Sequence, residues 1–401
     1  MLIKVGGKMS YNKFEEKARR AISEMKSLGV AEATIVHHDD ADGLCSAAIT
    51  KKALEREGFK VKTFCLEKIY PEVVQSLHEE DNRLIFYVDI GSAHADYISE
   101  CNKGRNLTII LDHHDPKPAT DPKVYDLNLE HYGFKGETDF SGATCCYLFA
   151  KTLNPINTDL SYLAIIGSCE IPSGFLSLNK AVLEEALKNG IIKPARKTYE
   201  IAKFGIRVDK FFSVLQILGA AGYYEGGPAL GIEACLNGLN EKIEKKVEEL
   251  ENKRKTTNKR LLAILYRQRL KETEHIQWFD AGDLYKGMGS KVIGQFCSFL
   301  SYQARLVKPD KYIVGFMNLQ PEIPGWGRLK QTLAKASVRT PKALKKLIED
   351  GKMPGAVEVL VEASKGFGIA DGHQYAANVV LPRDMKEKLI ENAEHYLKSR
   401  F

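Results

Sequence analysis

ATIVHHDDADGLCSA (residues 33–47) contains a short apolar run, a polar loop and the beginning of a helical pattern, in that order. The apolar run at 33–36 predicts a strand, and helical spacing then continues to about residue 57. A helix over 11–29, closed by Gly29, precedes the strand. Strand, loop and helix in this order are the usual opening of a parallel α/β sheet, so we predict the α/β class with an open parallel sheet in the N-terminal domain.

The same pattern recurs along the next seventy residues. KVKTF (60–64), RLIFYVDI (83–90) and NLTIILDHH (106–114) predict strands, and the last two end in the polar clusters VDIG and LDHHD. Ligands of open α/β sheets bind at the carboxyl ends of the strands. We therefore expect the three polar clusters to converge on one crevice.

The length of 401 residues exceeds what one hydrophobic core usually supports. Residues 155–240 are predicted to be mostly helical, and 240–275 predict a long charged connecting helix. Strand and helix patterns beyond it predict a second, smaller α/β unit. The expected domains are 1–235 (catalytic), 236–275 (helical connector) and 276–401 (nucleic-acid binding).

Charge is unevenly distributed between the two halves of the chain. The net charge of +6 divides into −4 for residues 1–240 and +10 for residues 241–401. The basic half is therefore a candidate surface for a polyanion. The alternative for residues 241–272 is that the lysines only keep a long helix in solution.

Features of secretion and membrane insertion are missing from the sequence. The N-terminus has no signal-peptide pattern, and no window approaches about 20 uninterrupted apolar residues. The eight cysteines are scattered without a Cys-x-x-Cys pair, which favours reduced thiols over a zinc or redox motif. We predict a cytoplasmic protein with no membrane partner.

The three polar clusters contain the residue types that bind a divalent cation. Their candidate ligands are His38, Asp40, Asp42, Asp89 and His113. Carboxylate and imidazole groups suit an oxygen-preferring ion such as Mn²⁺. Aspartates in such loops also cap helices, so the first cluster alone leaves both interpretations open. Three clusters at one sheet edge favour the metal site.

HHDDADG (37–43), VDIG (88–91) and LDHHD (111–115) resemble the first three motifs of the DHH phosphoesterases. DFSGATCC (139–146) resembles the serine-containing helix start that follows in the family. IIGSCEIP (165–172) falls where the family has its fourth metal carboxylate. The resemblance covers nearly the whole chain and looks closest to the archaeal RecJ-like proteins, which act on single-stranded DNA or RNA.

This resemblance implies two Mn²⁺ or Mg²⁺ ions and assigns the catalytic residues. Asp89 would bridge the ions, His38 and Asp40 would bind one, and Asp42, His113 and Glu170 the other. His114 would face the substrate phosphate. Val36 stands where many relatives have a histidine, so either His37 or His38 would be the ligand, and Glu170 stands in place of the usual aspartate.

Two C-terminal segments resemble the substrate-binding domain that accompanies the family's catalytic domain. KASVRT (335–340) is similar to its phosphate-contacting strand, and GFGIADGHQYAAN (366–378) to its glycine-histidine loop. The implied substrate-binding residues are Arg339, Gly372 and His373. Trp326, followed by Arg328, is a candidate for stacking a base, and a core position is the alternative.

The resemblance implies an exonuclease that hydrolyses single-stranded DNA or RNA to mononucleotides. The expected partners are single-stranded nucleic acid and a replication or DNA-repair helicase complex. One alternative is a phosphodiesterase for short oligonucleotides, like the nano-RNases, or for linear dinucleotides. The other is a non-catalytic replication or repair adaptor. Cleavage polarity and preference for DNA or RNA stay open.

Overall fold

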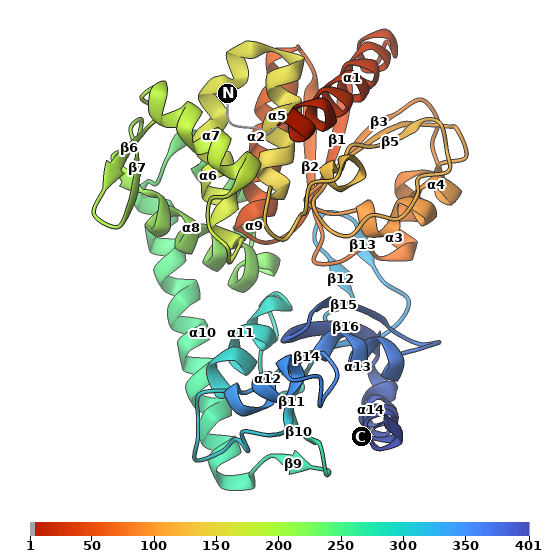
Figure 1. The fold of residues 1–401 in the computed structure, drawn as a ribbon, viewed down its shortest axis with the longest axis vertical. Helices are drawn as coiled ribbons and strands as arrows, with labels where there is room; N and C mark the ends of the chain where they lie inside the picture. The colour runs from red at the N-terminus through yellow and green to blue at the C-terminus, as the bar shows by residue number, and fades with distance from the viewer. Residues whose placement is uncertain (1–4, 401) are drawn as a thin grey trace. The chain divides into compact units, whose positions relative to one another are not determined.

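The computed structural model describes residues 5–400, with side chains from residue 10 onward. The chain forms two compact units (Figure 1). The N-terminal unit extends to Gly219 and includes Gly226–Val247, and the C-terminal unit comprises Ala220–Glu225 and the chain from Glu248. Helix α10 (Glu241–Gln268) begins in the first unit and continues in the second. Within residues 5–400, no helix combines the length and apolar character needed to cross a bilayer.

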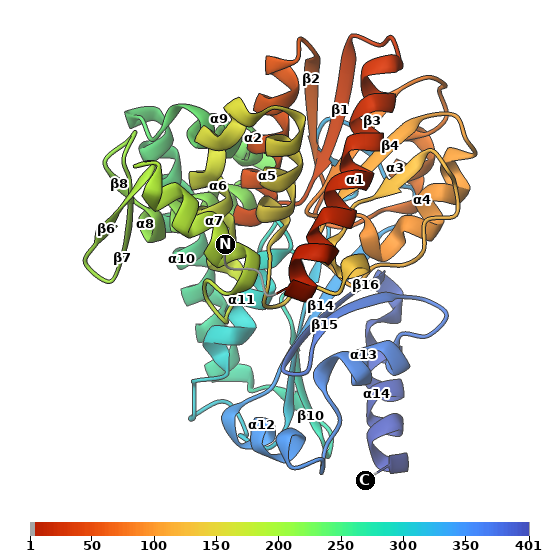
Figure 2. The same ribbon diagram turned by 45° about the horizontal axis from the view of Figure 1, so that its top comes forward.

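The N-terminal unit is built on a parallel five-stranded sheet with the order β2-β1-β3-β4-β5 (Figure 2). The strands are β1 (Glu32–His37), β2 (Lys60–Cys65), β3 (Leu84–Val88), β4 (Leu107–Leu111) and β5 (Val124–Asp126). Every residue of β3 and β4 is buried, as expected for parallel strands covered on both faces. The predicted α/β class and parallel sheet are confirmed. The strand order reverses between β1 and β3, and such a switch point opens a crevice at the carboxyl edge.

Helices surround this sheet. They include α1 (Val5–Ser27), α2 (Ala41–Arg56), α3 (Pro71–Leu77), α4 (Ala95–Asn102), α5 (Gly142–Leu153), α6 (Ser161–Gly167), α7 (Ser177–Lys188), α8 (Val208–Gln216) and α9 (Gly227–Asn237). Helix α2 packs against α5, α6 and α9, so the helix that follows the first polar cluster lies inside the unit. Its residues from Ala41 to Thr50 are all buried.

Residues 192–207 depart from the predicted helical region. They form a small antiparallel sheet of β6 (Ile192–Ala195), β7 (Thr198–Ile201) and β8 (Ile206–Arg207). Ile192 pairs with Ile201 across the first two strands, and these two isoleucines are its fully buried residues. With strands of only two to four residues and so few buried positions, the period-two apolar pattern that identifies a strand is too short to recognise.

The C-terminal unit contains a six-stranded mixed sheet with the order β15-β16-β14-β11-β10-β9. Its strands are β9 (Lys271–Glu272), β10 (Ile276–Asp280), β11 (Tyr312–Asn318), β14 (Leu333–Arg339), β15 (Ile369–His373) and β16 (Ala376–Pro382). The helices are α11 (Lys291–Leu300), α12 (Lys342–Glu349), α13 (Ala356–Ala363) and α14 (Lys386–Arg400). One apolar cluster joins the sheet to α12, α13 and α14, and another joins it to α10 and α11.

His78 gives the N-terminal unit a specific dependence on pH. Its ring is buried between Asn102 Oδ1, 2.9 Å from Nδ1, and the Tyr87 hydroxyl, 3.1 Å from Nε2. Burial lowers the pKa of His78 below the ordinary 6.5. The unfolded chain therefore takes up the proton first, so the stabilisation is complete above pH 6.5 and is lost as the pH falls below it.

We expect His78→Gln to lower the unfolding free energy at pH 7.5 by about 1–2 kcal/mol, because a buried hydrogen bond is lost. Its unfolding free energy should then fall less than that of the wild type between pH 7 and pH 5. Urea titrations at both pH values measure the difference. Equal pH dependence in the two proteins would show that His78 is not the responsible group.

Candidate functional site

The loop after β1 places His38 and Asp40 at the carboxyl edge of the sheet. Asp40 is the N-cap of α2, and its Oδ1 accepts a hydrogen bond of 2.9 Å from the Gly43 N–H. Its other oxygen, Oδ2, lies 2.9 Å from His38 Nδ1. Asp40 therefore caps α2 through one carboxylate oxygen and places the other beside His38.

Asp89 follows β3 directly and has a backbone φ of 57°, in the left-handed region that aspartate tolerates better than most residues. Its Oδ2 lies 3.6 Å from His38 Nδ1, and its Oδ1 lies 3.4 Å from His113 Nε2. Oδ1 is buried and accepts no hydrogen bond from the described residues. Burial, together with the nearby carboxylates of Asp42 and Asp40, raises the pKa of Asp89 well above its ordinary value.

Asp112 organises the two histidines that follow it. Its Oδ1 accepts a hydrogen bond of 2.7 Å from His114 Nδ1, and its Oδ2 accepts one of 2.9 Å from the Ser92 N–H. Burial opposes ionisation of Asp112, but the His114 imidazole and these hydrogen bonds outweigh it and lower the pKa of Asp112 well below the usual range.

His113 Nδ1 donates to the Gly136 carbonyl at 3.0 Å, so Nε2 is left to face Asp89. Burial lowers the pKa of His113, which favours the neutral ring that a metal ligand requires.

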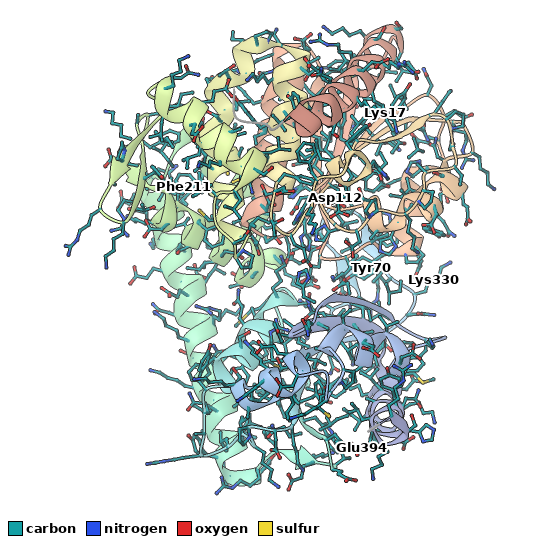
Figure 3. All side chains as sticks on the ribbon, viewed as in Figure 1. Lys17, Tyr70, Asp112, Phe211, Lys330 and Glu394 are labelled. Carbon is teal, nitrogen blue, oxygen red and sulfur yellow. The ribbon has the colours of Figure 1, made fainter. Side chains whose placement is uncertain are left out.

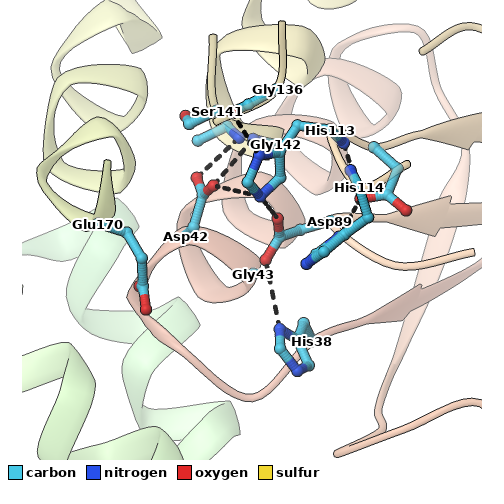
Figure 4. A network of polar contacts seen from close by, with 12 residues as sticks. His38, Asp42, Gly43, Asp89, His113, His114, Gly136, Ser141, Gly142 and Glu170 are labelled. Atoms are coloured by element: carbon cyan, nitrogen blue, oxygen red, sulfur yellow. Dashed lines mark hydrogen bonds and ion pairs between the residues drawn. The ribbon is translucent and has the colours of Figure 1, made fainter. Parts of the chain in front are cut away.

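Two groups of potential metal ligands at this edge of the sheet share one residue (Figure 4). His38, Asp40 and Asp89 form one group, and Asp89, His113 and His114 form the other, with the potential ligand atoms of each group within 4.8 Å of one another. The buried oxygen Asp89 Oδ1, which lacks a hydrogen-bond donor, is suited to an ion. A divalent cation would also relieve the repulsion between the buried carboxylates. The donor set of carboxylates and neutral imidazoles thus fits Mn²⁺ or Mg²⁺.

Three other predicted residues lie outside these two groups. Asp42 accepts hydrogen bonds of 2.8 Å from the N–H groups of Gly142 and Ala143, at the beginning of α5. Glu170 accepts a hydrogen bond of 2.8 Å from Gln216 Nε2. His37 donates from Nδ1 to the His38 carbonyl at 2.8 Å, and burial lowers its pKa to about 4.

Glycines that the sequence did not single out pack directly against the site. A Cβ on Gly142 would lie 2.3 Å from Asp89 Oδ1, and a Cβ on Gly167 would lie 2.3 Å from Asp42 Oδ1. Real Cβ atoms do not approach so closely, so a side chain at either position would require the neighbouring carboxylate to move. The sequence contains one indication of this constraint. Gly142 directly follows the N-cap Ser141, at a helical position where alanine has the higher helix propensity.

Arg339 ends β14 in the C-terminal unit. Its Nε donates to Ser298 Oγ at 2.9 Å and its Nη1 donates to the Val338 carbonyl at 2.8 Å. Among the residues that the structure describes, no carboxylate pairs with Arg339, and burial lowers its pKa. A Cβ on Gly294 would lie 2.7 Å from Nη2, so this glycine keeps space open beside the guanidinium. A half-buried guanidinium without a carboxylate is suited to an anion.

The remaining predicted substrate residues lie on exposed elements of the same unit. Gly372 and His373 belong to the edge strand β15 rather than to a loop, because their backbone pairs with β16. A Cβ on Gly372 would lie 2.5 Å from the Ala376 carbonyl, so the close approach to β16 requires glycine.

Trp326 lies in the turn between β12 (Glu322–Ile323) and β13 (Gly327–Arg328). It is half-buried and belongs to neither apolar cluster of the unit. The Arg328 guanidinium forms an exposed ion pair of 2.7 Å with Glu322.

Comparisons with known proteins agree with this arrangement. Residues 32–168 match the DHH family, N-terminal domain. A search of curated proteins found no match. RecJ from Thermus thermophilus, solved with Mn²⁺, is similar to all of this chain at 18% identity and a TM-score of 0.65, and the chain spans 55% of that protein.

Two further structures cover almost the entire chain. An exonuclease RecJ bound to manganese shares 18% identity over 97% of this chain and 94% of its own, with a TM-score of 0.62. CDC45 from Entamoeba histolytica shares 11% identity over 97% of this chain and 98% of its own, with a TM-score of 0.51. At these identities the likeness concerns the fold, which confirms the RecJ-like architecture expected from the motifs.

Proposed function

We propose that the protein is a two-metal phosphoesterase, because residues 32–168 match the DHH family, N-terminal domain, and the fold is similar to that of RecJ. Its proposed reaction is hydrolysis of phosphodiester bonds at the ends of single-stranded DNA or RNA, with release of mononucleotides. The observation that carries the proposal is that one buried carboxylate, Asp89, belongs to two groups of potential metal ligands.

The proposed metal-binding residues are His38, Asp40, Asp42, Asp89, His113 and Glu170. Divalent ions in such a centre supply Lewis acidity and lower the pKa of water towards neutrality. Asp42 keeps lone pairs for an ion while its oxygens accept hydrogen bonds from the beginning of α5. Those bonds fix the orientation of the carboxylate, which supports a role in a preorganised centre.

His114 is proposed to bind the substrate phosphate. Asp112 holds the ring through Nδ1, so Nε2 is the ring nitrogen directed away from Asp112. The His114 side chain is 47% exposed, whereas that of His113 is 16% exposed, which leaves His114 accessible to a phosphate oxygen.

In the C-terminal unit, Arg339, Gly372 and His373 are proposed to bind the nucleic-acid backbone, with Trp326 and Arg328 as further contacts.

The length of the substrate distinguishes the proposed exonuclease from a phosphodiesterase of short oligonucleotides. We would incubate the protein in Mn²⁺ or in EDTA with end-labelled single strands of two to thirty nucleotides. The proposal expects Mn²⁺-dependent shortening of the long strands to mononucleotides. Cleavage restricted to the shortest strands would favour the oligonucleotide phosphodiesterase, and binding without cleavage would favour the adaptor.

We expect Arg339→Gln to weaken binding of a single-stranded oligonucleotide by about tenfold, because hydrogen bonds to charged groups typically contribute about 1.5–3 kcal/mol. The loss of affinity should be similar for all nucleotide sequences. The slope of log affinity against log salt concentration should decrease by the contribution of about one phosphate contact. Fluorescence anisotropy at several salt concentrations measures both. Arg400→Gln, which removes an exposed arginine paired with Glu358 at 2.9 Å, is the matched control and should bind normally. Equal losses in the two variants would exclude a specific role for Arg339.

A further inference from the structure

The N-terminal unit contains a cavity of about 680 Å³ that the proposed reaction does not use. Its walls come from α1, from residues 118–126 and from the short helix η2 (Leu129–Tyr132). None of the proposed metal ligands lines it. We refer to it as the α1 cavity. Figure 3 labels Lys17, which lines it, and Asp112, which belongs to the site described above.

The α1 wall of the cavity is cationic. Lys13, Lys17 and Arg20 line it, and Glu16 is the acidic residue that α1 contributes. Glu16 pairs with Arg20 at 2.5 Å, so this carboxylate is already engaged. The two lysines are four residues apart and therefore lie on the same face of α1.

The lysines are not neutralised by ion pairs. Among the described residues, neither Lys13 nor Lys17 has a carboxylate oxygen within the 4.0 Å of an ion pair, and Lys17 Nζ makes a long contact of 3.4 Å with the Asp126 carbonyl. Each ammonium group has three N–H donors, so at least five of the six donors are available to an anion. Two such groups one helical turn apart are suited to one phosphate.

The carboxylates of the opposite wall are engaged by other donors. Asp126 is buried and accepts hydrogen bonds from Ser92 Oγ at 2.8 Å and from His131 Nε2 at 2.7 Å. Asp121 accepts hydrogen bonds from Asn102 Nδ2 at 2.9 Å and from the Lys123 N–H at 2.8 Å. These carboxylates therefore do not reach across the cavity to bind the two lysines.

Aromatic rings complete the lining. Tyr125 and Tyr132 both border the cavity and are only partly buried. Tyr132 packs edge-on against Phe14 with ring centroids 6.0 Å apart, and the Tyr125 hydroxyl hydrogen-bonds Glu24. Rings that are held in place beside cationic groups are the combination that binds nucleobases and their phosphates.

We propose that the α1 cavity binds a nucleoside monophosphate, with its phosphate on Lys13 and Lys17 and its base against the tyrosines. The cavity volume lies within the range of small-molecule sites. The ligand is either a free nucleotide or the phosphorylated end of a strand, because both present the same chemistry. This site goes beyond the proposed hydrolysis and does not require a metal ion.

Isothermal titration calorimetry with AMP tests the proposal. The protein carries Arg339→Gln, which removes the arginine proposed to bind phosphate in the C-terminal unit. The buffer contains EDTA and little salt, so the result is independent of metal-dependent hydrolysis. AMP should bind with one site per chain, and adenosine should bind much more weakly. Lys17→Gln should weaken AMP binding by about tenfold, as expected for a hydrogen bond to a charged group.

Arg19→Gln is the matched control, because Arg19 lies on α1, is exposed, pairs with Glu15 at 2.6 Å and does not line the cavity. It should bind AMP normally. A 5′-phosphorylated trinucleotide that binds as tightly as AMP would identify a strand end as the ligand, whereas binding of AMP alone would identify the free nucleotide. Absence of AMP binding, or equal losses in Lys17→Gln and Arg19→Gln, would overturn the proposal.

Discussion

Asp89→Asn is expected to abolish Mn²⁺-dependent hydrolysis and to weaken Mn²⁺ binding by at least about 10²-fold. Loss of a group that only supports a metal ligand typically lowers affinity or activity about 10- to 100-fold, and Asp89 is itself shared by both ligand groups. The amide has nearly the same shape as the carboxylate but lacks the negative charge. The loss should therefore come from the metal centre rather than from packing.

The same substitution should leave the metal-free protein at least as stable as the wild type. Asp89 is buried next to other carboxylates, and its neutral substitute avoids their repulsion. Thermal unfolding in EDTA and in Mn²⁺ measures both effects. Asp121→Asn, a buried aspartate of the same unit outside both ligand groups, is the control and should keep the Mn²⁺-induced rise in Tm. An Asp89→Asn protein that Mn²⁺ stabilises as much as the wild type would contradict the assignment.

Gly142→Ala is expected to weaken Mn²⁺ affinity by about 10- to 100-fold, the loss typical of disturbed support for a ligand. The added Cβ would lie 2.3 Å from Asp89 Oδ1, so the carboxylate must move. Helix propensity alone predicts the opposite sign, because alanine stabilises a helix by about 1 kcal/mol relative to glycine. The steric effect should prevail, since a single methyl group meets a buried side chain that has little room to move.

Gly231→Ala is the matched control for this experiment. Gly231 also lies in a helix of the N-terminal unit, and its Cβ would meet Leu44 Cδ1 at 2.7 Å, at the end of a flexible apolar side chain. It should reduce stability without changing the Mn²⁺ affinity, as measured by calorimetry. Equal Mn²⁺ affinities of Gly142→Ala and the wild type would show that the position of the Asp89 carboxylate does not require glycine at position 142.

The parallel sheet and the convergence of the polar clusters at one edge were predictable because their signals are local. RLIFYV and NLTIIL are uninterrupted apolar runs that end in Asp89 and Asp112, and parallel strands bring such ends to one edge. The sheet of β6 to β8 was not predictable, since it buries too few residues to produce a pattern.

The details of the site depend on contacts between distant parts of the chain. The hydrogen bonds between Asp42 and the N–H groups of Gly142 and Ala143 join residues about one hundred positions apart, and no spacing rule predicts them. The contact between Gly142 and Asp89 is of the same kind. In the C-terminal unit, the glycine-histidine segment is a strand because β16 supplies its hydrogen-bonding partner, which the segment's own sequence does not reveal.

We propose that Asp89 is shared by two metal ions in one centre. The most direct test is the number of Mn²⁺ ions bound per chain at equilibrium, measured by electron paramagnetic resonance of the free ion for the wild type and Asp89→Asn. We predict two ions for the wild type and loss of both from the variant at the same free Mn²⁺ concentration. A single ion in the wild type, or unchanged binding in the variant, would contradict the shared centre.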